Sequence, residues 1–453
     1  MDCPLTPLDG RYLNKTKELR TYFSENAFFK YRYLVEIKYF IELISVLPEL
    51  KILKGKTTEI NKLLEVYENF NEQDYEIIKK HEAITNHDIK ALEYFIQDKF
   101  KELKLDEYIT FIHFGITSQD INTTANIYSL TEALNNIIIP EIQNIINTLN
   151  NLSNDMKSSI MLSHTHGQAA VPTTMGKELY VYKYRLEEQL KLLQNKDLYT
   201  SKFGGAVGNF NAHCYAYPDI NWNEFADKFI NSFGLHRERY TTQISNYDNL
   251  SNIFNILKTI NNIVNDLNID SWLYISKGYL IQKVNPNETG SSTMPHKVNP
   301  IHFENSEGNI CIANSLIEGI TRKISISRLQ RDLTDSTILR NIGVVLGYCL
   351  VSYKSTISGL NKIAINNDFL SEELENNIVV LTEAMQTIMR KYKIKNSYEI
   401  VKNISRINTS NIEQKIDCKQ KLDNIYNTLS EEAQFELQNL NMLNYIGYSD
   451  KFT

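Results

Sequence analysis

The segment with the densest reactive chemistry spans residues 290–300 and reads Gly-Ser-Ser-Thr-Met-Pro-His-Lys-Val-Asn-Pro. Gly290 permits backbone angles that other residues avoid, and the two prolines disfavour helix at the residues that precede them. We therefore expect an extended, irregular loop between two long helices. Such a loop can offer a hydroxyl as nucleophile or base and, a few residues on, a cation and an amide donor. The alternative is a polar surface connector, which is what most loops are.

Two further clusters contain histidine. Residues 163–168 read Ser-His-Thr-His-Gly-Gln and precede a helix expected from about Thr174. A His-x-His pair alone is a weak zinc signal because a zinc site needs a third or fourth ligand. The pair is either a surface feature or, if a second loop supplies the partner, a source of an acid/base histidine. In residues 85–88, Thr-Asn-His-Asp, an Asn or Asp that caps the following helix is a sufficient explanation.

Two segments could bind an anion. In residues 113–120, Thr117 and Ser118 could cap a helix N-terminus, whose exposed amides suit a carboxylate or a phosphate. In residues 328–340, Arg331 and Arg340 bracket a helix start with Ser336 as the candidate cap, and guanidinium groups there would hold phosphate. The alternative for residues 113–120 is an ordinary helix cap. The alternative for residues 328–340 is a solvated charged turn, which is the better interpretation of any single Arg there. The chain has no P-loop, Gly-rich nucleotide loop, GxSxG or HExxH motif, which removes the common kinase, dehydrogenase and hydrolase classes.

Long helices must position these segments. Residues 49–139, 219–285 and 301–453 contain no proline, which costs about 3 kcal/mol in a helix interior. Apolar residues follow the i, i+3, i+4, i+7 spacing of one helix face in residues 142–152, 179–193 and 253–267. Asn pairs inside these patterns, such as Asn261–Asn262, are interpreted as compositional drift.

One helix is expected to be central. Residues 338–360 are apolar on most sides, as in a buried core helix. No alternating strands bounded by turn pairs recur, so no substantial sheet is expected. The predicted fold class is all-α, with a central bundle of long helices flanked by two smaller helical domains. The predicted boundaries are 1–114, 115–365 and 366–453, which agrees with the roughly three domains that 453 residues suggest.

Composition excludes several classes of protein. Lys and Arg number 48 against 54 Asp and Glu, a formal net charge of −6, so a dedicated nucleic-acid binder is not expected. No run of about 18 apolar residues predicts a membrane-spanning helix, and the first residues lack the pattern of a signal peptide. The five cysteines are widely spaced and form no CxxC, which favours a reducing cytoplasm over a disulfide framework.

Taken together, these segments resemble one family. Residues 290–300 resemble the GSSxMPxKxNP signature loop of the fumarase/aspartase superfamily. His296 is typical of its branch that acts on succinylated purine nucleotides, whereas fumarases tend to have Gly at that position and argininosuccinate lyases Gln. Gly167 after His166 is typical of the same branch. Residues 7–12, 85–88, 328–340 and 444–447 fit the same branch, so the resemblance covers essentially the whole chain.

The resemblance implies a fold, an activity and an assembly. The fold would be the all-α superfamily fold, in a homotetramer whose active sites are each assembled from three subunits. The reaction would be β-elimination of fumarate from adenylosuccinate, giving AMP, and from the succinyl-aminoimidazole-carboxamide ribotide of purine biosynthesis. No metal or organic cofactor, nucleic acid or membrane would be involved.

The resemblance also implies roles for individual residues. Ser291 would be the general base, with its pKa lowered by Lys297 and the loop amides, and His166 the general acid, with His87 binding or orienting nearby. Lys297 would also hold the substrate carboxylate. The residues expected to bind the phosphate, purine or succinyl part are Arg11, Tyr12, Asn86, Asp88, Thr117, Ser118, Gln168, Gln243, Ser292, Asn299, Asn305, Arg331, Ser336 and Arg340.

One residue departs from the pattern, and two other hypotheses stay open. Many relatives of this branch have Arg where this chain has His164, which puts a secondary contact in doubt rather than the chemistry. The chain could instead be another lyase of the superfamily, such as one acting on argininosuccinate. It could also be a non-catalytic helical scaffold, but loss of Ser291, His166 or Lys297 would then be expected, and all three are present.

Overall fold

The computed structural model describes residues 4–283, 294, 296–405 and 412–452. The chain divides into two compact units. The first unit comprises Met1–Gln143, Glu188–Asn262 and Gly308–Lys354, and the second comprises Asn144–Glu187, Ile263–Glu307 and Ser355–Thr453. Both units are built mainly from helices, which confirms the predicted all-α class. The predicted boundaries after residues 114 and 365 stay a prediction.

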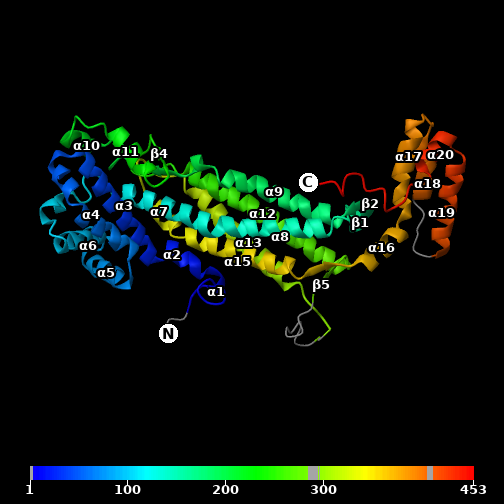
Figure 1. Cartoon of the computed structure of the whole chain (residues 1–453), viewed down its shortest axis with the longest axis horizontal. Helices are drawn as coiled ribbons and strands as arrows, with labels where there is room; N and C mark the ends of the chain where they lie inside the picture. The colour runs from blue at the N-terminus through cyan, green and yellow to red at the C-terminus, as the bar shows by residue number, and fades with distance from the viewer. Residues whose placement is uncertain (1–3, 284–293, 295, 406–411, 453) are drawn as a thin grey trace. The chain divides into compact units, whose positions relative to one another are not determined.

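The first unit holds most of the short and medium helices (Figure 1). Its parallel strand pair is β3 (Thr200–Lys202) with β4 (His236–Glu238). Its own helices are α1 (Leu13–Thr16), α2 (Arg20–Phe23), α3 (Glu25–Val46), α4 (Thr57–Glu68), α5 (Glu72–Thr85), α6 (Asp88–Glu102), α7 (Ser118–Ala133), α10 (Asn211–Ala216), α11 (Trp222–Asn231) and α14 (Thr334–Leu339).

The second unit contains two antiparallel strand pairs and the C-terminal helices. The strands are β1 (Ile160–Thr165) with β2 (Gln168–Thr174), and β5 (Leu280–Gln282) with β6 (Ile363–Ile365). The helices are α16 (Asn367–Asn376), α17 (Thr382–Lys391), α18 (Ser397–Ser405), α19 (Ile412–Asn427) and α20 (Glu431–Leu437). Figure 1 shows α17 to α20 grouped together. Among the described residues all strands are short and paired in twos, in agreement with the expectation of no substantial sheet.

Five long helices contribute residues to both units. They are α8 (Ile139–Asp155), α9 (Met175–Leu193), α12 (Asp248–Lys277), α13 (Ile301–Lys323) and α15 (Ile342–Leu360). The helices predicted from the apolar spacing in residues 142–152, 179–193 and 253–267 are confirmed as α8, α9 and α12.

The predicted helix over residues 338–360 is interrupted. α14 ends at Leu339 and α15 begins at Ile342, and the backbone N–H of Asn341 donates to the carbonyl of Ile338. Residues Thr334–Leu360 are long and apolar enough to cross a membrane by length and composition, yet more than half of this stretch is buried inside the structure. Burial of this kind is what the central position expected for this segment requires.

Asparagines join the long helices by hydrogen bonds within each unit. In the first unit, fully buried Asn261 donates to Asn314 Oδ1 at 2.9 Å and accepts from the hydroxyl of Tyr353 at 2.6 Å. In the second unit, Asn268 donates to Ser306 Oγ and accepts from Thr356, both at 2.9 Å. The interpretation of Asn261 as compositional drift is wrong, because its amide satisfies polar groups of two neighbouring helices.

The start of α7 is anchored by a buried ion pair. The Asp120 carboxylate and the Lys202 ammonium are fully buried and 2.7 Å apart. The carboxylate also accepts backbone N–H groups from Thr117 at 2.9 Å, Gly204 at 2.8 Å and Gly205 at 3.0 Å. Burial lowers the pKa of Lys202, and the attraction of Asp120 opposes that shift. One carboxylate thus joins the first turn of α7 to the segment after β3.

We expect Asp120→Asn to destabilise the protein more than Lys202→Met. The Asp120 variant leaves a buried ammonium without its counter-charge, which costs about 3–5 kcal/mol. The Lys202 variant leaves a carboxylate that still accepts three backbone N–H groups. The midpoints of urea unfolding of both variants and the wild type measure this order. A larger loss for Lys202→Met would show that the amides do not hold Asp120.

Candidate active site

A pocket of about 350 Å³ in the first unit gathers several of the predicted residues. Its wall is formed by α3, the junction of α5 and α6, the start of α7, and residues 331–340. The predicted residues in the wall are Asn86, His87, Asp88, Ser118, Arg331, Ser336 and Arg340. A small-molecule site of this size, with a few convergent polar groups, is common in proteins.

The junction of α5 and α6 presents His87 to this pocket. Asn86 ends α5 in the left-handed conformation, with φ of 50°, which Asn tolerates better than most residues. The predicted cap by Asn or Asp is wrong, because His87 is the N-cap of α6 and its Nδ1 accepts the backbone N–H of Lys90 at 3.2 Å. Since Nδ1 is an acceptor, a neutral His87 carries its proton on Nε2, and that N–H is available to a ligand.

Asp88 is held by an arginine that the sequence analysis did not select. Arg32 on α3 is 3 % exposed and its Nη2 lies 2.9 Å from Asp88 Oδ2. Burial raises the pKa of Asp88, but the charge and hydrogen bond of Arg32 and the N–H of Ile89 outweigh it and lower the pKa below its usual value. Asp88 is therefore a carboxylate at neutral pH, and it directly follows the His87 cap.

Arg331 and Ser336 meet on the other side of the pocket. Arg331 donates to Gln243 Oε1 at 3.1 Å, which brings predicted Gln243 to the same group, and its Nη2 lies 3.5 Å from Ser336 Oγ. Ser336 does not cap a helix as predicted. α14 begins at Thr334 with Leu333 as its N-cap residue, and the backbone N–H of Thr334 donates to Asp332 Oδ1 at 2.9 Å. Ser336 thereby lies inside the helix, and its hydroxyl also accepts from Gln119 at 3.4 Å.

The amide at the start of α7 is already occupied. Thr117 is the N-cap, as predicted, but its N–H donates to Asp120. Only Ser118 of this predicted pair lines the pocket. The guanidinium groups of Arg331 and Arg340 are the cationic side chains among the predicted residues that line the pocket.

The sequence analysis missed the polar face of α7. Gln119, Asn122 and Asn126 are buried and line the pocket, and Asn122 Oδ1 makes no hydrogen bond to the described residues. These residues recur at the spacing at which a helix normally places apolar core residues. Polar residues at the spacing of a buried helix face were therefore the sequence signal that could have identified this side of the pocket.

Four predicted residues of the first unit do not line this pocket: Thr117 and Gln243, described above, and Arg11 and Tyr12. Arg11 is exposed, and the Tyr12 hydroxyl accepts from Asn309 Nδ2 at 3.4 Å. The segment before them packs on α15 where Gly347 allows close approach, because a Cβ there would lie 2.8 Å from Leu8 Cδ1.

The other predicted residues belong to the second unit. His166 and Gln168 are exposed on a β-hairpin where a segment leading into a helix was expected, and His166 and Gly167 both have positive φ, as in a type I′ turn. Lys297 is exposed, and Asn299 and Asn305 are half-buried, with Asn305 donating to Ser355 on α15 at 2.9 Å. Ser291 and Ser292 lie outside the described residues.

His164, the residue that departs from the family pattern, sits beside an acidic side chain. Its Nε2 is 3.9 Å from Glu373 Oε1, and its ring packs near Tyr279. Burial and the charge of Lys277 lower the pKa of His164, against the effect of Glu373. At neutral pH this position is therefore uncharged, unlike an arginine.

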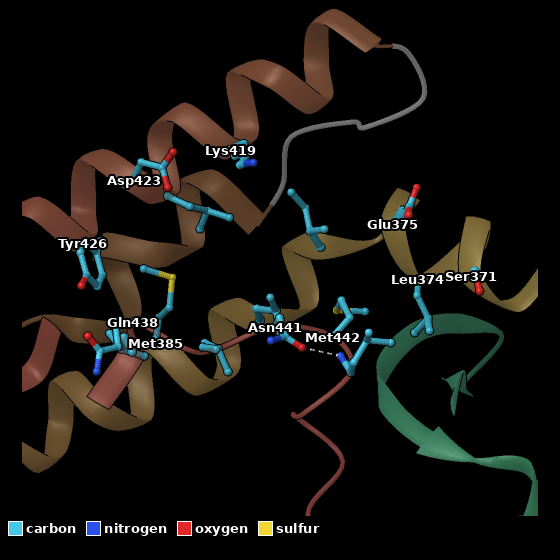
Figure 2. A pocket seen from close by; sticks show the side chains of 16 residues that line it. Ser371, Leu374, Glu375, Met385, Lys419, Asp423, Tyr426, Gln438, Asn441 and Met442 are labelled. Atoms are coloured by element: carbon cyan, nitrogen blue, oxygen red, sulfur yellow. Dashed lines mark hydrogen bonds between the residues drawn. The ribbon is translucent and has the colours of Figure 1, made fainter. Parts of the chain in front are cut away.

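A larger cavity, of about 720 Å³, lies among α16, α17, α19 and α20 in the second unit. Figure 2 shows that apolar side chains such as Met385, Leu374 and Met442 point into it, with Lys419 and Asp423 on its edge. None of the predicted site residues lines it. We assign the candidate site to the smaller pocket because the imidazole, hydroxyl and guanidinium groups are there.

Two family models match the chain. A model described as lyase matches residues 10–313, and one described as adenylosuccinate lyase C-terminal matches residues 327–446. Among solved structures, a fumarate lyase from Mesorhizobium sp. BNC1 has a TM-score of 0.74 at 17 % identity, with 96 % of each chain covered. A β-carboxy-cis,cis-muconate cycloisomerase from Acinetobacter calcoaceticus sp. ADP1 has a TM-score of 0.71 at 16 % identity, covering 96 % of this chain and 95 % of the other. These two likenesses confirm the fold.

Curated relatives are much more similar in sequence. The adenylosuccinate lyase of Dictyostelium discoideum is 46 % identical, over 99 % of this chain and 97 % of its own length. Those of Haemophilus influenzae and Escherichia coli are 43 % and 40 % identical, each over 98 % of this chain and 96 % of their own length. The chain therefore belongs to the fumarase/aspartase superfamily and, within it, to the adenylosuccinate lyases, which are C–N lyases.

A half-buried histidine four residues before the Thr117 cap predicts a pH-dependent stability. His113 Nδ1 is 2.5 Å from Glu36 Oε1. Burial disfavours the imidazolium, but the charge and hydrogen bond of Glu36 outweigh it and raise the pKa of His113. A raised folded-state pKa stabilises the protein fully below the unfolded pKa of about 6.5, and this stabilisation is lost as pH rises through the folded-state value.

We therefore expect Glu36→Gln to lower the Tm more at about pH 6 than at about pH 9, as measured by thermal scans. The matched control is Glu42→Gln on the same helix, because its partner Lys228 is an exposed ammonium group rather than a partly buried imidazole. Equal losses at both pH values would contradict a charged His113–Glu36 pair.

Proposed function

We propose that the chain eliminates fumarate from adenylosuccinate, giving AMP, and from succinyl-aminoimidazole-carboxamide ribotide in purine biosynthesis. The observation that carries the proposal is the meeting of Arg331, Ser336 and Arg340 with His87 in one pocket of about 350 Å³. Guanidinium groups and a hydroxyl suit a phosphate, and an imidazole N–H suits a second polar group of the same ligand.

The proposed chemistry is a proton abstraction followed by C–N cleavage. Ser291, as an alkoxide, removes the proton from the carbon next to the substrate carboxylate. The electron pair passes into that carboxylate as an aci-carboxylate, which the Lys297 ammonium and the Asn299 amide stabilise. The pair then returns to form the double bond of fumarate as the C–N bond breaks. His166, as general acid, gives a proton to the departing nitrogen.

The remaining residues hold the substrate in this proposal. Arg331, Arg340 and Ser336 bind the phosphate, assisted by Arg11 and Tyr12. The His87 Nε2–H orients the ligand. The contacts with the nucleotide and succinyl parts are assigned to Asn86, Asp88, Thr117, Ser118, Gln168, Gln243, Ser292 and Asn305.

We also propose that the protein works as a cytoplasmic homotetramer with active sites shared between subunits. His166 and Lys297 are exposed on the single chain, although acid and electrostatic catalysis work best where water is excluded. A neighbouring subunit would provide that cover. A reducing compartment is supported by the free thiols of Cys214, Cys311, Cys349 and Cys418, which are all the cysteines in the described part of the chain.

The purified protein should release fumarate from adenylosuccinate, with AMP as the second product. It should release none from argininosuccinate or malate, since the anion pocket and the family both favour a nucleotide. Ultraviolet absorbance of fumarate and chromatography of AMP measure the products. Fumarate from argininosuccinate alone would overturn the purine assignment, and no fumarate from any of the three would favour the non-catalytic scaffold.

Ser291→Ala and His166→Ala should each lower kcat by about 10²-fold or more, the usual effect of losing acid or base catalysis. If sites are shared, mixing the two inactive variants and exchanging subunits should restore activity in roughly a quarter of the sites, by random assortment in a symmetric oligomer. Subunit exchange is verified by mass spectrometry of differently tagged chains. No recovery after verified exchange would place both groups of a site in one chain.

A further inference from the structure

The polar face of α3 contacts two segments that form or lead into the wall of the candidate pocket, residues 87–88 and residues 113–118. Arg32 and Glu36 are one turn apart, so their side chains leave the same face of the helix. We propose that Arg32 and Glu36 are positioning residues for the reaction: Arg32 fixes the His87–Asp88 segment, and Glu36 fixes the segment that ends at Thr117 and Ser118. This inference rests on the proposed function.

Arg32 acts on the first of these segments through Asp88. Its guanidinium lies 3.9 Å from the ring centroid of Phe28 and pairs with Asp88 Oδ2. The other carboxylate oxygen, Asp88 Oδ1, accepts the backbone N–H of Ile89 at 2.9 Å. The residue immediately after the His87 cap is thus tied both to the first turn of α6 and to α3. Burial lowers the pKa of Arg32 to about 10, which leaves it charged at neutral pH.

Glu36 acts on the second segment through His113. His113 has a φ of 56°, a left-handed conformation that is uncommon for a residue with a side chain, so its backbone must be held by its surroundings. The Glu36 contact provides that hold. One residue further on, Phe114 has its carbonyl accepting the hydroxyl of Tyr39, also on α3, at 2.6 Å. The backbone that leads to the α7 cap is therefore fixed at two successive residues.

Stability alone is a poor explanation for these two charges. Arg32 Nε and Glu36 Oε2 are buried and make no hydrogen bond to the described residues, so each side chain is only partly satisfied. Partly satisfied buried charges are often replaceable by apolar residues without loss of stability. Arg32 itself lines the pocket, and the partners of Arg32 and Glu36 sit in segments that form or lead into its wall.

A second ion pair of the first unit offers a matched control. Arg237 is also 3 % exposed, and its Nε lies 2.7 Å from Asp227, which is 31 % exposed compared with 27 % for Asp88. Arg237 and Asp227 do not line the candidate site. Arg32→Met and Arg237→Met therefore each remove a guanidinium–carboxylate pair with similar side-chain exposure, one at the site and one away from it, although Asp227 keeps a second cation, Arg239, at 3.3 Å.

The test compares kcat, KM and Tm of these two variants of the full chain with adenylosuccinate. We expect Arg32→Met to lower kcat/KM by on the order of 10- to 100-fold, because small misplacements of site groups have effects of this size. The kcat/KM of Arg237→Met should stay within about two-fold of the wild-type value, although its Tm falls by a similar amount, because this pair is not coupled to the pocket. Arg32→Lys, which keeps the charge, should recover part of the activity. Equal kcat/KM for the two Met variants would overturn the proposal for Arg32.

A double-mutant cycle tests whether Arg32 acts through Asp88. In an Asp88→Asn background, Arg32→Met should change kcat/KM by no more than about two-fold, because the contact it would break is already weakened. A full additive loss would show that Arg32 contacts the ligand itself, and would overturn its role as a positioning residue.

Hydrogen exchange separates this inference from the proposed function. Arg32→Met should speed amide exchange in residues 87–90, and Glu36→Gln in residues 113–118, by several-fold over Arg237→Met and Glu42→Gln. Unchanged exchange in these segments would overturn the proposal even in an active enzyme. A wild-type protein that makes no fumarate would overturn the proposed function and leave the exchange result valid for the positioning.

Discussion

The candidate site depends on the buried carboxylate of Asp120. It accepts three backbone N–H groups and the Lys202 ammonium, so the first turn of α7 and the segment after β3 share one anchor. Ser118 and Gln119 line the pocket from that turn, and their direction follows from it. The Thr117 amide is thus occupied by Asp120, and the guanidinium groups of Arg331 and Arg340 line the same pocket as Ser118 and Gln119.

A second constraint comes from α3, which carries the charges that pair with the two pocket segments. The chain places charged groups in its interior at Arg32, Glu36 and Lys202, where an apolar core would be simpler. Each of them contacts a residue within a few positions of a pocket residue. Burial strengthens such contacts because the surrounding dielectric is low. The first unit therefore holds its polar pocket partly through buried charges, whereas apolar contacts and buried asparagine hydrogen bonds join its long helices.

The long helices could be predicted from the sequence, and the contacts between them could not. Periodic apolar residues identify α8, α9 and α12 because a helix face repeats within one segment. The Arg32–Asp88 pair joins residues that are far apart in the chain, and nothing local to either one signals it. The helix caps were predicted only in part, because the N-cap of α6 is His87 rather than Asn or Asp, and α14 begins at Thr334, so that Ser336 lies inside it. The short β1–β2 hairpin carries too little alternation to be distinguished from a loop.

The family motifs pointed to some residues that share a pocket in the single chain and to others, such as His166 and Lys297, that are exposed on it. The proposed roles of the two groups explain this difference. Phosphate binding needs directional donors, and Arg331, Ser336 and His87 already share a pocket. Elimination additionally needs a low-dielectric setting for the charge that develops on the carboxylate. His166 is exposed at the tip of a hairpin, and Lys297 is exposed ahead of α13. In the proposed tetramer, one chain would provide most of the phosphate-binding residues, and a neighbouring subunit would cover the catalytic residues. Association of subunits would therefore affect turnover more than it affects nucleotide binding.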